Sequence, residues 1–94
     1  MKRKIFWSKE AEIRIVKITD YLHEHWSDKS AKTFLDILED KLSLLALYPE
    51  MCESSLSKKG IRRCVITKHI SILYGFNNKE VNIFTVIDNR QKND

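Results

Sequence analysis

Basic side chains concentrate in one short part of this sequence, and they are its clearest candidates for chemistry. Between Glu53 and Glu80 the chain has six Lys or Arg residues and no Asp or Glu. An uneven positive charge attracts acidic partners, either nucleic-acid phosphates or an acidic protein segment. It equally fits basic residues that keep a sheet edge soluble and unpaired. The candidate binding residues in and after this stretch are Lys58, Lys59, Arg62, Arg63, Lys68 and Arg90.

A catalytic site built on these arginines needs a general acid or base close by. His69 is one candidate, because an unperturbed imidazole titrates near neutral pH. No second titrating partner lies close to it in the sequence, so an ordinary histidine at a strand end fits as well. No serine stands in a G-x-S-x-G turn, and two glycines are too few for the usual phosphate-binding loop.

The remaining potential metal ligands have unsuitable spacing. His23 and His25 are two residues apart and fall on different faces of a helix. Cys52 and Cys64 lack a second Cys or His pair at zinc-ligand spacing. Because no signal peptide is evident, we expect a reducing cytoplasm and two free thiols. No apolar run approaches the ~20 residues that span a bilayer. We therefore expect no metal, no cofactor and no membrane.

Three strand-forming runs must position the basic residues of positions 60–90. Apolar side chains recur at every second position in two of these runs, which is the period of a strand. Asn77-Asn78 tolerates positive φ and predicts a tight hairpin turn, and Thr67-Lys68 predicts another. The runs therefore predict a three-stranded antiparallel meander. The two alternating sets are Ile70, Ile72, Tyr74 and Phe76, then Val81, Ile83, Thr85 and Ile87.

Two amphipathic helices precede the meander and supply the surface on which it is buried. A short strand at residues 5–7 leads to Ser8, which predicts the N-cap of a helix that runs to about Trp26. Ser27-Asp28 predicts the cap of a second helix that ends near Tyr48. Pro49 stops this helix because proline disfavours helical geometry in the residue before it.

The order of elements predicts a single α+β domain over residues 1–94. It reads β-α-α-β-β-β, with a helical hairpin packed on one face of a small, mainly antiparallel sheet. Residues 50–59 lack periodicity and read as a mobile loop. Arg62 and Arg63 point to opposite faces of one strand, so one flanks the core and the other faces outward.

A succession of residues along the chain resembles a known family. It resembles the RelE/ParE superfamily of type II toxins, and the ParE-like (plasmid stabilisation) branch more than the RelE branch. The residues that carry this resemblance are Phe6-Trp7-Ser8-Lys9-Glu10-Ala11, Tyr21-Leu22, Ala31, Phe34, Leu38, Leu42, Leu45, Tyr48-Pro49, Gly60-Ile61-Arg62-Arg63, Ile72-Leu73-Tyr74, Ile83 and Asp88-Asn89-Arg90-Gln91.

The resemblance implies a bacterial cytoplasmic toxin that a cognate antitoxin neutralises in a hetero-oligomer. ParE-like members act on DNA gyrase, whereas RelE-like members cleave mRNA on the ribosome and often carry a C-terminal Tyr or His. No Tyr or His follows Arg90. This absence favours the gyrase inhibitor, without catalytic chemistry of its own. A ribonuclease is the alternative, with Arg62, Arg63, His69 and Arg90 as its catalytic candidates.

For the antitoxin, the resemblance implies contact with the helical hairpin and the sheet. We expect the outward side of the hairpin and the basic strands to bind it. Large apolar side chains that remain exposed on the hairpin are natural anchors for a partner. The candidates are Trp26, Phe34 and Leu44, beside the basic residues named above.

Overall fold

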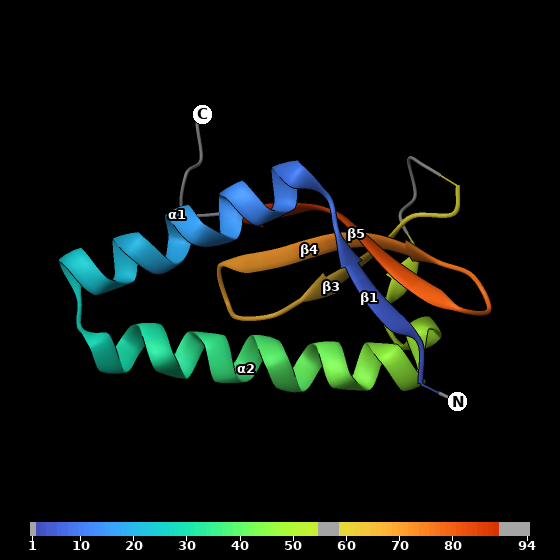
Figure 1. Ribbon diagram of the computed structural model, residues 1–94, viewed down its shortest axis with the longest axis horizontal. Coiled ribbons are helices and arrows are strands. Elements are labelled where there is room, and N and C mark those ends of the chain that lie inside the picture. The colour runs from blue at the N-terminus through green and yellow to red at the C-terminus, as the bar shows by residue number, and fades with distance from the viewer. Residues whose placement is uncertain (1, 55–58, 89–94) are drawn as a thin grey trace.

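Two helices lie against one face of a five-stranded sheet (Figure 1). The structure, a computed structural model, describes residues 2–54 and 59–88. Its elements are β1 (Lys4–Trp7), α1 (Lys9–His25), α2 (Asp28–Leu47), the 3-10 helix η1 (Pro49–Met51), β2 (Glu53–Ser54), β3 (Arg62–Val65), β4 (Ile70–Phe76) and β5 (Glu80–Asp88). The predicted α+β fold, with a helical hairpin on a mainly antiparallel sheet, is confirmed.

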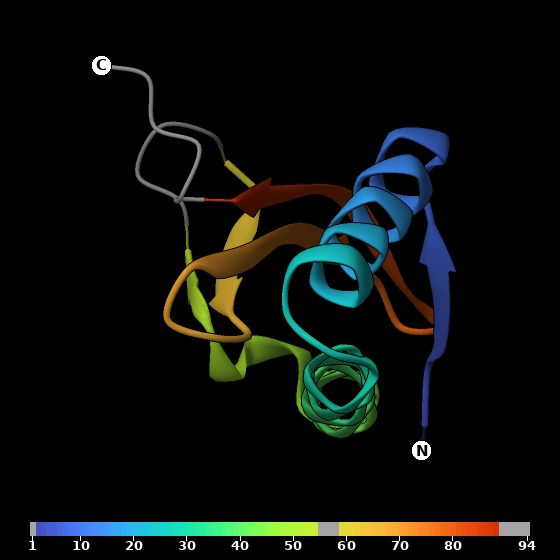
Figure 2. The same cartoon turned by 90° about the vertical axis from the view of Figure 1, so that its left-hand side faces the viewer.

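The strands lie in the order β1-β5-β4-β3-β2. The predicted meander is present, because β4 pairs antiparallel with β3 on one side and with β5 on the other. β1 pairs parallel with β5, and the long connection that a parallel pair requires contains both helices, η1 and strands β2 to β4. β1 therefore forms one edge of the sheet. In Figure 2 it stands on one side of α2, while the turn between β3 and β4 stands on the other.

The prediction of an irregular loop at residues 50–59 was wrong in its first half. Pro49–Met51 forms η1, and Glu53–Ser54 pairs antiparallel with Arg63 and Arg62. A two-residue strand is too short to show any periodicity, so the sequence carried no signal for it. Residues 55–58 of the expected loop lie outside the described residues.

Both helices begin where their capping residues predict. The Ser8 hydroxyl accepts a hydrogen bond from the Ala11 amide, and the Ser27 hydroxyl accepts one from the Ser30 amide. Trp26 and Tyr48 follow the last helical residues as C-caps, within a residue of the predicted ends. Over the described residues, no helix is both long and apolar enough to cross a membrane.

A β-bulge in β5 changes which of its residues are buried, so part of the predicted core is wrong. Val81 and Ile83 are buried as expected, but the next buried side chain is Val86. The register shifts by one residue after Ile83, because Tyr74 lies opposite Ile83 while Leu73 lies opposite Thr85. One inserted residue reverses the alternation of the strand beyond it. Thr85 and Ile87, predicted to share the face of Ile83, are therefore only partly buried.

The turn between β4 and β5 also differs from the prediction. No residue other than Gly60 has positive φ in the part of the chain described, so Asn77-Asn78 does not form the expected turn. Instead the Asn77 side-chain oxygen accepts hydrogen bonds from the amides of Lys79 (2.8 Å) and Glu80 (2.9 Å). Its side chain thus completes the turn without a left-handed backbone.

The expectation of two free thiols is likewise wrong in this structure. Cys52 and Cys64 form a disulfide that joins the segment before β2 to the middle of β3. Sequence spacing cannot indicate this pair, because the two residues become neighbours only when β2 pairs with β3.

Candidate protein-binding groove

An apolar groove of about 410 Å³ opens between the two helices and the turn that joins β3 to β4. We call it the hairpin groove. None of the residues that line it is acidic, and Lys29 and His69 contribute basic side chains to it. The residues that line it are Ile18, Leu22, Trp26, Lys29, Ser30, Thr33, Phe34, Ile37, Thr67, His69 and Ile70.

The short connection between the helices leaves the largest side chain of the groove exposed. The amides of Trp26 and Ser27 both donate to the Leu22 carbonyl, which ends α1 in a tight turn. The Trp26 side chain is then 69% exposed, whereas Phe34 on the next helix is 5% exposed. Phe34 therefore forms the floor of the groove, and Trp26 stands at its rim. A large exposed aromatic beside an apolar hollow is typical of surfaces that bind another protein, so the groove is a candidate binding site.

Main-chain hydrogen bonds fix the third wall of the groove. The amides of Ile66 and Thr67 donate to the Ile70 carbonyl, at 2.8 and 3.1 Å. The Thr67 hydroxyl lies 3.3 Å from the Ile70 amide, from which it accepts a hydrogen bond. His69 and Lys68 are both exposed on this turn. The predicted turn at Thr67-Lys68 is thus confirmed, and it holds His69 against the groove.

Arg62 is occupied by main-chain groups of its own protein. Its Nη1 donates to the Cys52 carbonyl at 2.6 Å, and it lies 3.4 Å from the Glu50 carbonyl. Its Cζ also lies 5.8 Å from the centroid of the Phe76 ring. These contacts bind β3 to the segment before β2. Arg62 is therefore the arginine that flanks the core, as one of the pair was expected to do.

Tyr74 holds the same segment from the central strand. Its side chain is fully buried, and its hydroxyl donates a 2.6 Å hydrogen bond to the Pro49 carbonyl. Burial raises the pKa of the Tyr74 phenol above its ordinary value of 10.0, and the nearby Arg62 charge opposes this shift. The phenol is therefore a neutral donor that anchors η1, and it is no general base at neutral pH.

The outward face of the sheet carries the second arginine. Arg63 and Val65 are exposed on it, and they lie opposite Leu73 and Ser71 of β4. A Cβ atom on Gly75 would stand 3.1 Å from both the Phe84 ring and the Gly60 carbonyl. The absence of a side chain on Gly75 thus lets these two groups lie close to the outward face.

The structure brings together only some of the predicted site residues. Trp26, Phe34 and His69 share the hairpin groove, with Lys68 beside them on the turn. Arg63 pairs with Leu73, three residues beyond Ile70, which places it roughly 10 Å farther along the sheet. Lys59 is exposed near Gly60. Lys58 and Arg90 lie outside the described residues.

Comparison with known proteins decides the family. Residues 5–93 match the family described as ParE toxin of type II toxin-antitoxin system, parDE. The chain belongs to the ParE toxin family. The resemblance to the RelE/ParE superfamily is thereby confirmed. No match was found among curated protein sequences.

Solved structures share the fold of this ParE-family chain at low sequence identity. A chain of the chromosomal ParDE toxin-antitoxin system from P. aeruginosa is 13% identical, with a TM-score of 0.75 over 93% of this chain and 96% of that one. A chain of the E. coli DinJ-YafQ complex is 16% identical, with a TM-score of 0.66 over 98% of both chains. A conserved hypothetical protein of Helicobacter pylori is 17% identical, with a TM-score of 0.59 over 96% of this chain and 97% of that one.

Sequence reasoning missed several groove residues in this ParE-family chain. Thr33 and Ile37 on α2 line the groove, and Ile37 remains 39% exposed although it borders the apolar stripe of the helix. Thr67 and Ile70 line it from the turn, although nothing in their local pattern indicates a binding site. Leu44, expected as an anchor, is exposed on α2 but does not line the groove. The position of Ile37 at the margin of the apolar stripe of α2 is the one feature of the sequence that could have indicated the groove.

Proposed function

We propose that this chain is a toxin whose hairpin groove receives a segment of a cognate antitoxin in the bacterial cytoplasm. The observation that carries the proposal is the exposure of Trp26 and Ile37 around the buried Phe34 floor. Burying such side chains against a partner removes apolar surface from water, which drives association. Membership of a toxin-antitoxin family and structural likeness to a chain of a ParDE system support the same partner.

The charge of the groove indicates the composition of the antitoxin segment. Lys29 and His69 line the groove, Lys68 lies beside it, and no lining residue is acidic. An aliphatic segment that carries acidic residues matches this surface, and such a segment is often disordered until it binds. We infer that the segment folds as it docks and that its affinity falls with rising salt concentration.

We further propose that the target of the free toxin is DNA gyrase. Support comes from the positions of the candidate catalytic residues in the described part of the chain. Arg62 donates to main-chain carbonyls, and His69 lies in the hairpin groove rather than beside Arg63. General acid-base cleavage of RNA needs such groups within hydrogen-bonding reach of one phosphate. A ribosome-dependent endoribonuclease is the second candidate, favoured by the exposed Arg63 on the outward sheet face.

A plasmid supercoiling assay with purified gyrase separates the two targets. We expect this protein to inhibit supercoiling and to leave linearised plasmid after denaturation of the trapped enzyme. Protein whose fold has been verified by circular dichroism, yet which has no effect on gyrase, would refute the gyrase proposal. Ribosome-dependent mRNA cleavage that Arg63→Ala abolishes would then establish the endoribonuclease.

A further inference from the structure

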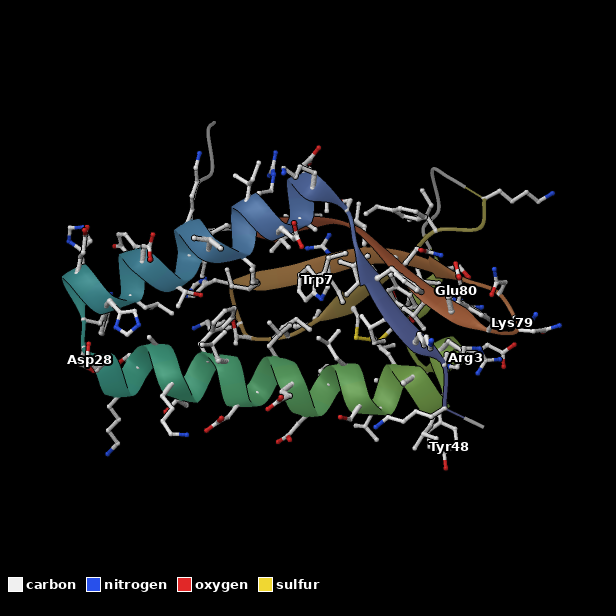
Figure 3. All side chains as sticks on the ribbon, viewed as in Figure 1. Arg3, Trp7, Asp28, Tyr48, Lys79 and Glu80 are labelled. Atoms are coloured by element: carbon white, nitrogen blue, oxygen red, sulfur yellow. A yellow bond between two sulfur atoms is a disulfide. The ribbon has the colours of Figure 1, made fainter. Side chains whose placement is uncertain are left out.

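The disulfide between Cys52 and Cys64 joins two segments that the sheet already places side by side. Glu53 of β2 pairs with Arg63 of β3, so Cys52 lies opposite Cys64 in the same register. Their Cα atoms are 5.2 Å apart, within the range that a disulfide spans. Figure 3 shows the bonded sulfur atoms in yellow, and both residues pack with the hydrophobic core. The pairing of the two segments therefore brings the sulfur atoms together even without the bond.

Hydrogen bonds to main-chain carbonyls also hold the Cys52 segment against the sheet. Arg62 Nη1 donates to the Cys52 carbonyl at 2.6 Å and lies 3.4 Å from the Glu50 carbonyl. The Tyr74 hydroxyl donates to the Pro49 carbonyl at 2.6 Å. These contacts do not require the disulfide, so the folded protein should keep both thiols close together after reduction. Two thiols held in this way have a high effective concentration, and the bond can form again without a folding step.

The two cysteines differ in their access to solvent. Cys64 is 1% exposed, whereas Cys52 is only partly buried. The Arg62 guanidinium lies beside Cys52, because it contacts the main-chain carbonyl of that residue. A neighbouring cation favours the thiolate, which is the reactive form of cysteine. Cys52 is therefore the residue that a soluble oxidant or thiol reaches first, and Cys64 is the residue that completes the reaction.

The cellular compartment decides what such a bond is for. The cytoplasm keeps most thiols reduced, and the disulfides that form there are usually transient and serve catalysis or redox sensing. This step of the argument rests on the cytoplasmic location proposed above, whereas the sulfur chemistry does not. A preformed pair with one accessible cysteine suits redox sensing better than a permanent cross-link.

We propose that Cys52 and Cys64 form a reversible redox switch, which is a dithiol in the reducing cytoplasm and a disulfide after exposure to a peroxide. The Cys52 thiolate attacks one peroxide oxygen, becomes a sulfenic acid and releases hydroxide, which recovers the proton that Cys52 had lost. The Cys64 thiol then attacks the Cys52 sulfur and forms the disulfide. Its proton leaves with the sulfenic hydroxyl as water. Both thiols are thus oxidised while hydrogen peroxide is reduced to water.

Soluble thiols return the switch to its reduced form by thiol-disulfide exchange. A thiolate attacks the Cys52 sulfur, and the Cys64 sulfur leaves with the electron pair and takes up a proton. A second thiolate attacks the soluble partner in this mixed disulfide, which releases the Cys52 thiolate and a soluble disulfide. The oxidised form has a shorter free chain when it unfolds, so its unfolded state is less populated. Oxidised toxin should therefore survive proteolysis longer than reduced toxin.

Alkylation and mass spectrometry of the purified full chain test the order of the two cysteines. The protein is reduced, freed of reductant and treated with hydrogen peroxide. We expect a disulfide within one chain, which reduced glutathione removes without denaturant. Cys64→Ala should stop at a Cys52 sulfenic acid that dimedone captures. Cys52→Ala should react with peroxide at least about tenfold more slowly, because its remaining thiol is buried. Circular dichroism checks that each variant is folded.

Substitution of Arg62 tests whether the hydrogen bonds prepare the pair. Equilibration with mixtures of reduced and oxidised glutathione gives the ratio of disulfide to dithiol. We expect Arg62→Ala to lower this ratio about tenfold, because one attachment of the Cys52 segment is lost. Arg63→Ala is the matched control, since the Arg63 side chain is exposed on the outward face. Its ratio should equal that of the unmodified protein.

Proteolysis measures the effect of the switch on the lifetime of the protein. We expect subtilisin to digest the oxidised protein at least about tenfold more slowly than the reduced protein. The variant with Cys52→Ala and Cys64→Ala should be digested at the same rate under both conditions. These experiments need neither gyrase nor antitoxin, so their outcome is separate from the fate of the proposed function.

Four outcomes would overturn the proposal. Folded protein that forms no intramolecular disulfide with peroxide would show that the cysteines are not a redox pair. A disulfide that glutathione removes only after denaturation would be a permanent cross-link. Faster oxidation of Cys64 than of Cys52 would reverse the assigned order. Equal digestion of the oxidised and reduced proteins would mean that the bond does not control the lifetime of the toxin.

Discussion

The guanidinium of Arg62 donates a 2.6 Å hydrogen bond to the main-chain carbonyl of Cys52, ten residues earlier in the chain. This bond gives Arg62 a structural role. It also separates Arg62 from Arg63, whose side chain is exposed on the outward face. The two adjacent arginines are therefore expected to respond differently to the same substitution.

We expect Arg62→Ala to lower the free energy of unfolding by about 1.5–3 kcal/mol, because a hydrogen bond from a charged donor is lost. Arg63→Ala should change it by less than about 0.5 kcal/mol, as is usual for an exposed residue. Urea unfolding followed by circular dichroism gives both values. Equal destabilisation by the two variants would mean that the contact with Cys52 contributes nothing particular.

Tyr74→Phe removes only the hydroxyl that donates to the Pro49 carbonyl. We expect the free energy of unfolding to fall by about 1–3 kcal/mol, because a buried carbonyl is left without this donor. The change should also speed amide exchange in Glu53–Ser54, since the segment between Pro49 and β3 loses one of its attachments. Tyr48→Phe is the matched control, because the Tyr48 side chain is exposed. If the midpoint of urea unfolding is the same for Tyr74→Phe as for the unmodified protein, the Tyr74 hydroxyl does not anchor η1.

Alkaline pH should destabilise the protein through the same side chain. Burial raises the pKa of Tyr74 in the folded state, so above pH about 10 the unfolded chain loses this proton while the folded chain keeps it. Stability from the neutral phenol is thus complete below that pH and is lost as pH rises toward the folded-state pKa. Melting temperatures between pH 8 and 11 should fall less steeply for Tyr74→Phe than for the unmodified protein. If the melting temperatures of the two proteins fall equally with rising pH, a group other than Tyr74 causes the loss of stability at alkaline pH.

The disulfide between Cys52 and Cys64 should stabilise the fold by restricting the unfolded chain. For a loop of this size the chain-entropy estimate is about 2–3 kcal/mol. We expect reduction with dithiothreitol to lower the melting temperature of the unmodified protein. A variant with Cys52→Ala and Cys64→Ala should melt near the reduced protein and ignore the reductant. Mass spectrometry after alkylation checks the redox state, and a reductant-sensitive double variant would contradict the assignment.

Two substitutions on α2 test the hairpin groove. Ile37→Glu places a carboxylate in the groove, whereas Leu47→Glu changes a residue of similar exposure outside it (39% and 45%). We expect Ile37→Glu to weaken binding of the co-expressed antitoxin at least about tenfold, because a buried interface charge costs more than 1.4 kcal/mol. Leu47→Glu should bind normally in isothermal titration calorimetry. Similar losses for both variants would place the antitoxin elsewhere.

Local patterns in the sequence were sufficient for most of the secondary structure. Ser8 and Ser27 mark both helix starts, and Pro49 marks the end of α2. The alternation of Ile70, Ile72 and Tyr74 predicts which face of β4 is buried. These signals work because a cap or a strand period depends on groups that are close together in the chain.

Local sequence patterns failed to predict features that depend on pairing between segments distant in the chain. The bulge after Ile83 arises from pairing with β4, and it moves Val86 into the core in place of Thr85. Likewise β2 exists only because β3 lies beside it, and that pairing also brings Cys52 to Cys64. None of these partners is a neighbour in the sequence, so no local pattern could indicate them.

By itself, the sequence determined the α+β class, the order of the main helices and strands, and the resemblance to a toxin family. Local periodicity, capping and a long succession of residue types carry that information. Only the tertiary structure decided which residues form a site. In the folded chain Arg62 donates to the Cys52 carbonyl, and β1 lies at one edge of the sheet. Trp26, Phe34 and His69 line the same groove. Those relationships depend on how the helices and strands pack across the chain, because side chains far apart in sequence meet only when the hairpin closes on the sheet.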